Sequence, residues 1–109
     1  MLWKHSLRAL AAIWALSAML AAADTQPPIL FKEGRFQPDV VKVPANTRFT
    51  LIIKNLDNEP SEFESFDLNR EKIINPGKEV EIYLGPLKPG DYQFFDDFHP
   101  RATGVIRAE

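Results

Sequence analysis

The chain has 109 residues, of which 13 are Lys or Arg and 15 are Asp or Glu, so its formal net charge at pH 7 is −2. This length suits one small domain. The sequence has no block of basic residues after its start, which argues against nucleic acid or an anionic lipid surface as a partner. It also has no cysteine. Disulfides and thiolate chemistry are therefore excluded, and the fold must be held by its hydrophobic core.

Residues 1–23 have the features of a secretory signal peptide. A basic start with Lys4 and Arg8 precedes an apolar run, and three alanines at 21–23 suit cleavage before Asp24. A retained membrane helix is the alternative, but the uncharged run ends at residue 23 and falls short of the ~20 residues that span a bilayer. We expect a signal peptide over 1–23 and a domain over 24–109, with no membrane insertion after cleavage. Loss of Lys4 and Arg8 takes the formal net charge from −2 to −4.

Short apolar runs separated by turn residues fill the first half of the expected domain. This spacing is typical of a β-sandwich or barrel, and no helical period of useful length follows residue 23. We expect strands over 29–32, 36–43 and 47–55. Pro38 and Pro44 should mark a bend or a sheet edge in the second of these strands, because proline cannot donate to a strand ladder.

The second half shows the same alternation. We expect a strand over 62–68, with Phe63 on one side and Glu62 and Glu64 on the other, and a strand over 78–84. Residues 70–74 fit either a strand or a loop. The nearby charges Asp67, Arg70 and Glu71 are expected to form surface ion pairs. Closing strands are expected from Tyr92 and over 103–108, so the pattern predicts an all-β Greek-key sandwich of about seven to eight strands.

Two aspects of the strand that begins at Tyr92 stand out. Tyr92 follows Pro89-Gly90 as in a tyrosine corner, in which the Tyr hydroxyl bonds to upstream backbone. Alternation then places Asp96 on the same inward side as Tyr92 and Phe94. An inward carboxylate must be solvated, paired or metal-bound, because an unpaired buried charge is costly. We expect Asp96 to be poorly paired without a metal, and His99, three residues on, is its candidate partner.

Other interpretations of these polar residues remain open. Asp96 and Asp97 could form a turn that ends the strand. His99 could be an ordinary loop residue. Glu62 and Glu64 could be solvent-facing charges on an edge strand.

Three segments carry a family resemblance. The string Val-Lys-Val-Pro-Ala-Asn-Thr at 41–47, then Asn55, then Pro-Gly-x-Tyr-x-Phe at 89–94 resembles the cupredoxin-like family over residues 29–108. Segments 62–68 and 94–100 are similar to the small periplasmic cupredoxins that accompany bacterial Ftr-type ferrous-iron permeases. The Glu62-x-Glu64 pair also resembles the cupredoxin domain of Efe-type iron-uptake proteins. The resemblance implies a cupredoxin-type sandwich in the periplasm.

The residues that hold blue copper in that family are mostly replaced. Where the family has His, Cys, His and Met, this chain has Ser61, Asp96, His99 and no Met after Met19. A type 1 copper centre depends on a thiolate, so this chain cannot form one.

The remaining candidate metal ligands are rich in oxygen. Carboxylate and imidazole groups suit iron, manganese, zinc or copper(II) and disfavour copper(I). As the resemblance implies, the segments at 60–64 and 96–99 can meet across neighbouring strands. The candidate ligands are Asp96, His99, Glu62, Asp97 and Glu64.

The function that the resemblance implies is assistance to ferrous-iron uptake. The protein would bind iron, or a copper ion that oxidises Fe(II), and would pass iron to a membrane permease together with a periplasmic iron-binding protein. Any enzymatic role would be an accessory ferroxidase-like one. The alternatives are a periplasmic copper(II) or zinc carrier and a metal-free interaction module. A hydrolase is not expected, because no nucleophile elbow accompanies the serines and His99.

Overall fold

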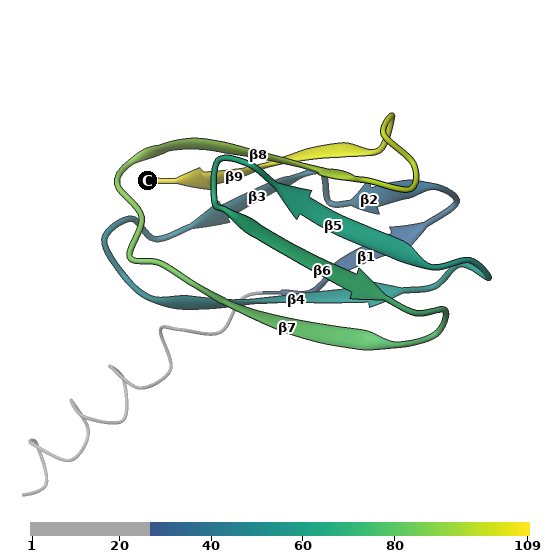
Figure 1. Cartoon of the computed structure of the whole chain (residues 1–109). Helices are drawn as coiled ribbons and strands as arrows, with labels where there is room; N and C mark the ends of the chain where they lie inside the picture. Colours follow the sequence, from purple (N-terminus) through teal and green to yellow (C-terminus); the bar gives the residue numbers. More distant parts are fainter. Residues whose placement is uncertain (1–26) are drawn as a thin grey trace, which may run out of the picture.

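A computed structural model describes residues 27–109, which form nine β-strands in two sheets (Figure 1). In chain order the strands are β1 (Ile29–Lys32), β2 (Arg35–Gln37), β3 (Val40–Val43), β4 (Phe49–Asn55), β5 (Ser61–Ser65), β6 (Arg70–Ile74), β7 (Glu79–Leu84), β8 (Gly90–Asp96) and β9 (Thr103–Ala108). The expected all-β sandwich is confirmed, with more strands than the seven to eight expected. The predicted signal peptide lies outside the described residues.

The two sheets are built mainly from antiparallel pairs. One sheet has the order β2-β1-β4-β7 and the other has the order β3-β9-β8-β5-β6. Two pairs are parallel, β1 with β4 and β3 with β9. In the second sheet β5 lies between β8 and β6, so β6 is an edge strand. Within residues 27–109 the structure holds no helix with the length and apolar character of a membrane crossing.

The strand expected over 36–43 is in fact two strands in different sheets. Strand β2 ends at Gln37 and pairs with β1, whereas β3 begins at Val40 and pairs with β9. Pro38 lies between them, at the point where the chain passes from one sheet to the other. The prediction of a bend at this proline is confirmed, and the prediction of one continuous strand is wrong. The segment at 70–74, which the sequence left open, is strand β6.

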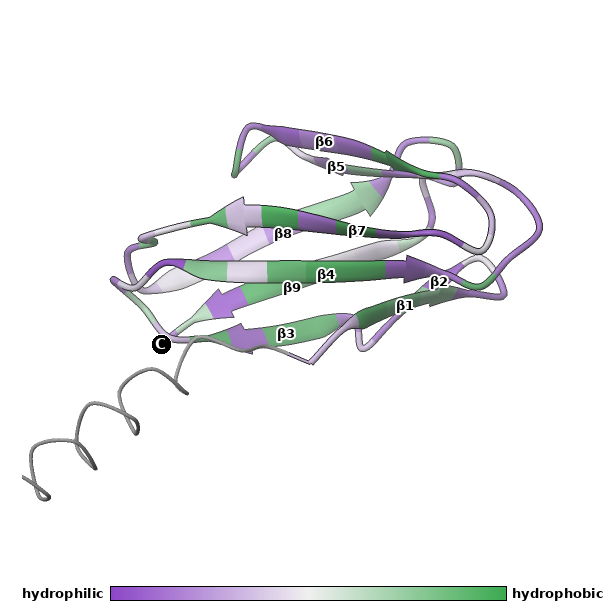
Figure 2. Ribbon diagram, turned by 90° about the horizontal axis from the view of Figure 1, so that it is seen from below, coloured by the Kyte–Doolittle hydropathy of each residue, from purple (hydrophilic) through white to green (hydrophobic). Residues whose placement is uncertain are grey.

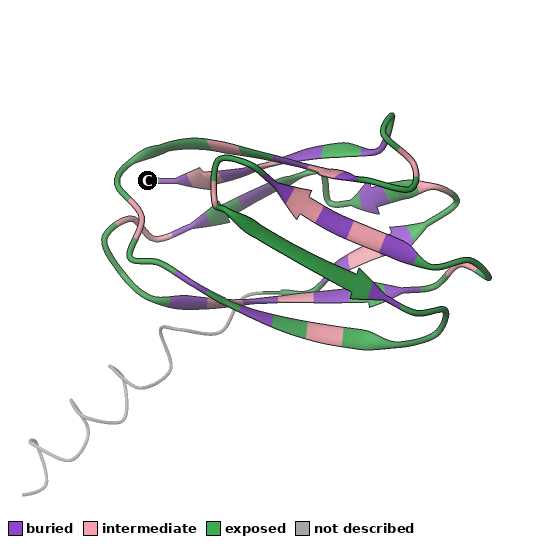
Figure 3. Ribbon diagram, viewed as in Figure 1, coloured by how far each residue is buried: buried purple, intermediate pink, exposed green. Residues whose placement is uncertain are grey.

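The core lies between the sheets and follows the alternation of the strands (Figures 2 and 3). In β4 the side chains of Phe49, Leu51 and Ile53 are buried. The largest fully buried side chains include Phe31, Phe63 and Phe94. The Phe63 and Phe94 rings pack with centroids 5.1 Å apart. Period-two burial of this kind is what a sheet with one face on a core requires.

Two local features fix the course of β8. The Tyr92 hydroxyl donates a hydrogen bond of 2.8 Å to the carbonyl oxygen of Lys88, which confirms the predicted tyrosine corner. Gly104 on β9 pairs with Phe94, and a Cβ at Gly104 would overlap the Phe94 ring. The ring therefore takes up the space that a side chain would fill on the neighbouring strand.

The register of β5 with β8 brings the two predicted site segments together. Phe63 pairs with Asp96, and the Asp97 N–H donates a 2.9 Å hydrogen bond to the Glu62 carbonyl oxygen. Inward and outward side chains alternate along both strands, so this pairing separates the polar residues into an inward group and an outward group.

Candidate metal centre

The inward group is centred on Asp96, which is fully buried. Its Oδ1 accepts hydrogen bonds from the backbone N–H groups of Glu62 and Phe98, each at 2.9 Å. Its Oδ2 accepts from the Ser61 hydroxyl at 2.9 Å and faces Nδ1 of His99 at 3.1 Å. A carboxylate can only accept, so Nδ1–H of His99 is the donor.

These contacts use the whole acceptor capacity of Asp96, since a carboxylate offers about four lone-pair sites. Among residues 27–109, every buried side-chain N or O atom has a hydrogen-bond partner. The expectation that Asp96 would be a poorly paired inward charge is therefore wrong. The inward placement is confirmed, and the partners that satisfy it come from the β5 strand and the loop after β8. In this arrangement Asp96 orients His99 through Nδ1.

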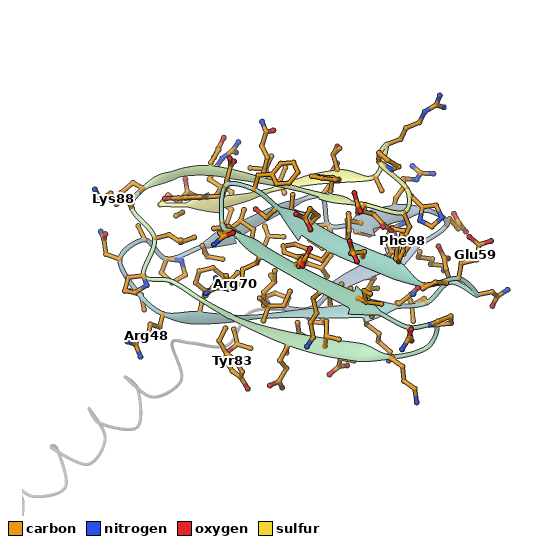
Figure 4. The ribbon with its side chains drawn as sticks, viewed as in Figure 1. Arg48, Glu59, Arg70, Tyr83, Lys88 and Phe98 are labelled. Atoms are coloured by element: carbon orange, nitrogen blue, oxygen red, sulfur yellow. The ribbon has the colours of Figure 1, made fainter. Side chains whose placement is uncertain are left out.

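His99 bridges this interior network to the surface. Its Nε2 lies 3.3 Å from Oε2 of Glu59, and its side chain is 35% exposed. Hydrogen bonding to Asp96 raises the pKa of His99 above 6.5, and Glu59 adds to the effect, while partial burial opposes it. A pocket of about 310 Å³, lined by residues 56–59 and His99, opens over this contact. Glu59 and Phe98 mark this end of the molecule in Figure 4.

The outward group is a cluster of four carboxylates, Glu62, Glu64, Glu71 and Asp97, which we name the acidic quartet. Ligand oxygens of Glu62, Glu64 and Glu71 lie within 4.8 Å of one another, and among residues 27–109 this is the one such group of three or more metal-binding side chains. Partial desolvation and the neighbouring Asp97 raise the pKa of Glu62. Partial desolvation and Glu71 raise the pKa of Glu64.

Glu71 joins this cluster through strand pairing. Glu64 on β5 is directly opposite Glu71 on β6, and directly opposed side chains share a face of the sheet. Within residues 27–109, the ion pairs expected among Asp67, Arg70 and Glu71 are not formed. Asp67 instead accepts a 2.8 Å hydrogen bond from the Gln93 N–H, and Arg70 donates to the Asn69 carbonyl at 3.1 Å.

The five ligands expected from the sequence thus fall into two places. Asp96 and His99 meet in the inward network, whereas Glu62, Glu64 and Asp97 meet in the acidic quartet on the outer face. Sequence reasoning missed Glu59 and Glu71, which reach these places through a loop and an edge strand. Nothing local marked either residue, because the five residues of β6 show no alternation of buried and exposed side chains and Glu59 lies outside the strands.

Solved structures and a curated relative resemble this chain. The Novel Purple Cupredoxin from Nitrosopumilus maritimus aligns with a TM-score of 0.59 and 22% identity, over 75% of this chain and 98% of that one. Amicyanin from Paracoccus versutus aligns with a TM-score of 0.63 and 14% identity, over 77% and 81%. An uncharacterized protein of Rickettsia prowazekii (strain Madrid E) is 51% identical over 79 residues. That match covers 72% of this chain and 63% of the relative, so the chain spans less than two thirds of the relative's length.

The residues present do not fit a blue copper centre. Such a centre needs a cysteine thiolate, and the sequence has no cysteine. Asp96 stands where the resemblance places that cysteine, and both of its oxygens are committed to hydrogen bonds within the protein. The scaffold is retained while its usual metal chemistry is not.

The family assignment rests on nearly the whole chain. The model of the Cupredoxin-like domain family matches residues 6–108. The two-sheet architecture agrees with the fold of the solved cupredoxins, whose identities to this chain are low enough that they inform on fold alone. The chain belongs to the cupredoxin-like domain family.

Proposed function

We propose that this protein binds iron through the acidic quartet and assists ferrous-iron uptake in the periplasm. The observation that carries the proposal is the convergence of the Glu62, Glu64 and Glu71 carboxylates within 4.8 Å. Carboxylate oxygens are hard ligands that suit iron and manganese and disfavour copper(I).

The electrostatics of the quartet support a cation as its ligand. The raised pKa values of Glu62 and Glu64 arise in part from the other carboxylates of the quartet. No ion pair within 4 Å involves any of the four among the described residues. A bound cation would offset this repulsion. Because carboxylates stabilise Fe(III) relative to Fe(II), bound iron would pass an electron to an external oxidant, such as a copper(II) ion, more readily than iron in water.

The proposal includes a second candidate metal site, which is formed at His99 and supported by Asp96. A metal-bound histidine usually donates its other ring N–H to a carboxylate, which fixes the ring. His99 has this arrangement, with Nδ1–H on Asp96 and Nε2 directed toward Glu59 at the pocket. In this proposal His99 is the ligand and Asp96 holds it in place.

A copper(II) or zinc carrier is the second candidate function, and the His99–Glu59 contact favours it. Ligand atoms of a tetrahedral ion with bonds of about 2.0–2.1 Å lie about 3.3 Å apart. The 3.3 Å between Nε2 of His99 and Oε2 of Glu59 has this length. Imidazole and carboxylate together suit zinc and copper(II).

The partners and location extend the proposal. A membrane iron permease would receive the iron, and a periplasmic iron-binding protein would act beside it. Export would depend on the signal peptide expected at 1–23. Sequencing the N-terminus of the protein from a periplasmic fraction should give Asp24 or a residue next to it. Full-length protein in the membrane fraction would contradict the location.

Anaerobic titration calorimetry of the parent protein with Fe(II), Mn(II), Zn(II) and Cu(II) tests the function. We expect Glu64→Gln to weaken Fe(II) and Mn(II) binding by at least ~10-fold, about 1.4 kcal/mol. His99→Asn should weaken Zn(II) and Cu(II) binding instead. Glu81→Gln, an exposed carboxylate on the other sheet, is the matched control and should bind as the parent does.

Each outcome selects among the functions. Loss of binding only in His99→Asn would favour the carrier over the iron protein. If the parent binds none of the four metals, or if both variants bind every metal as the parent does, the metal proposals fail. A metal-free interaction module would then be the remaining function.

A further inference from the structure

The outer face of β5, β6 and β8 places apolar side chains around the acidic quartet. Phe66, which follows β5, is 77% exposed, and Ile73 on β6 is 52% exposed. The Phe66 ring packs on the Phe95 ring of β8, with centroids 5.4 Å apart. Phe95 and Ile73 are directly opposite Glu64 and Glu62 respectively, so apolar and acidic groups share the same face. Isolated exposed apolar residues are normal, but a contiguous set marks a contact surface.

This apolar surface continues across the sheet beyond Phe95. A groove of about 560 Å³ runs over β8, β9 and β3, and its lining includes Phe95, Val105 and Val40. Val40 is paired with Val105 and is 40% exposed. The groove adjoins Phe95 on the side away from the quartet, and its lining also includes the polar residues Asp39, Gln93 and Thr103.

The edge of the sheet at this face is also open. Strand β6 is the last strand of its sheet, and four of its five residues are exposed (Figure 3). An edge strand presents unpaired backbone groups that another chain can pair with.

The charge of this face specifies the chemistry of its partner. The quartet supplies four carboxylates, and among residues 27–109 no Lys or Arg side chain forms an ion pair within 4 Å with any of them. Lys72 lines a hollow with Glu62, Glu71 and Ile73 but forms no ion pair with these carboxylates. A partner that brings cations would relieve the repulsion between these carboxylates, and complementary charge also orients and accelerates association.

We propose that this face is a docking surface for a protein segment that carries Lys or Arg side chains next to apolar ones. The basic side chains contact the acidic quartet, and the apolar side chains cover Phe66, Phe95 and the groove. This inference goes beyond the proposed function and does not depend on metal binding, although both use the quartet.

Fluorescence anisotropy with a labelled peptide of alternating Lys and Leu, in the presence of a chelator, tests the inference on the parent protein. We expect saturable binding that weakens as salt increases, because the charge contacts are exposed. A peptide of alternating Glu and Leu should not bind. A peptide of alternating Lys and Gly should bind more weakly, since it supplies charge without apolar contact.

Two variants separate the charge contribution from the apolar one. The triple variant Glu62→Gln/Glu64→Gln/Glu71→Gln should lose at least ~10-fold in affinity for the Lys-Leu peptide. Phe66→Ser should weaken binding of the Lys-Leu peptide and leave the affinity for the Lys-Gly peptide unchanged. Tyr83→Ser is the matched control, because Tyr83 is 70% exposed on the opposite sheet (Figure 4). Both Lys peptides should bind this control as they bind the parent.

Three results would overturn the inference. They are equal binding of the Lys-Leu and Glu-Leu peptides, parent-like affinity in the triple variant, and equal effects of Phe66→Ser and Tyr83→Ser. Because chelator is present throughout, failure of this surface is distinguishable from failure of metal binding.

Discussion

Asp96 occupies an interior position at the end of β8 and is stabilised there by donors from β5 and from the loop after β8. Ser61 and the Glu62 N–H come from β5, the Phe98 N–H comes from the following loop, and His99 closes the set. A buried polar group stabilises the folded state only when all its hydrogen-bond partners are present. A partner left unpaired has lost its hydration and gains no hydrogen bond in return. At this scale the network acts as one unit that holds the loop after β8 against β5.

Asp96→Ala should therefore lower the free energy of unfolding by about 3–5 kcal/mol, since it leaves the donors of Ser61, Glu62 and Phe98 without an acceptor. Asp96→Asn keeps one acceptor oxygen and should cost less. Urea denaturation followed by circular dichroism measures both. Asp97→Ala, which removes an exposed carboxylate next in the chain, should change the unfolding free energy by no more than about 0.5 kcal/mol. A gain in stability for Asp96→Ala would show that the network does not form.

His99 should make stability depend on pH. Its folded pKa is raised above 6.5 by Asp96 and Glu59, so the protonated ring is favoured in the folded state. The stability that it contributes is fully present below pH 6.5 and is lost as pH rises through the folded pKa.

We expect the urea midpoint of the parent to fall as pH rises from 6.5 through the folded pKa of His99. The midpoint of His99→Asn should not show this fall. NMR titration of the His99 ring should give a pKa above 6.5. A value at or below 6.5 would contradict the contacts with Asp96 and Glu59.

At the scale of elements, the β5–β6 hairpin combines unfavourable electrostatics with an exposed edge. Glu64 and Glu71 are directly opposite, and like charges in that arrangement destabilise a strand pair. Strand β6 adds little to the core, because Ile74 is its one buried residue. A hairpin arranged in this way is better suited to binding a cation or a basic partner than to stabilising the sandwich.

Glu64→Gln should consequently have opposite effects on stability and on binding. In chelator, loss of a repelling charge should raise the urea midpoint at neutral pH, and the difference from the parent should shrink as pH falls and the carboxyls are protonated. Its affinity for Fe(II) or Mn(II) should fall, as proposed above. The same pair of measurements on Glu81→Gln gives the baseline. A urea midpoint lower than that of the parent for Glu64→Gln in chelator would mean that the carboxylates of the quartet do not repel one another.

At the scale of the whole molecule, a cupredoxin-like sandwich persists without the thiolate that gives such proteins their blue copper chemistry. Its core is a cluster of buried aromatic and aliphatic side chains. Asp96, at the position where the resemblance places the copper cysteine, is part of a hydrogen-bonded network, and carboxylates gather on a different face.

Copper(II) added to the purified protein should accordingly give only weak visible absorption, because no cysteine is available for an intense charge-transfer band. Absorption spectroscopy of the parent with one equivalent of copper(II) measures this. His99→Asn should alter the weak band if copper occupies the pocket beside Glu59. An intense blue band would contradict the absence of a thiolate ligand.

The sequence by itself determined which residues of a strand share a face. Alternation along β8 placed Asp96 inward, alternation along β5 placed Phe63 on the opposite side from Glu62 and Glu64, and the absence of cysteine excluded blue copper. These properties are local, because side-chain direction in a strand follows from a period of two. The bend at Pro38 was also predictable locally, because proline cannot donate to a strand ladder, although the change of sheet was not.

Only the tertiary structure decided which side chains meet. Ser61 and Glu59 reach the Asp96–His99 network from 35 and 40 residues away along the chain. Glu71 joins Glu64 because β6 pairs with β5 in one register. Alternation along a strand indicates the face on which a side chain lies, but it does not indicate which strand lies beside it. For this reason the sequence predicted a poorly paired Asp96, and the assembled sheets show one whose acceptor sites are all filled.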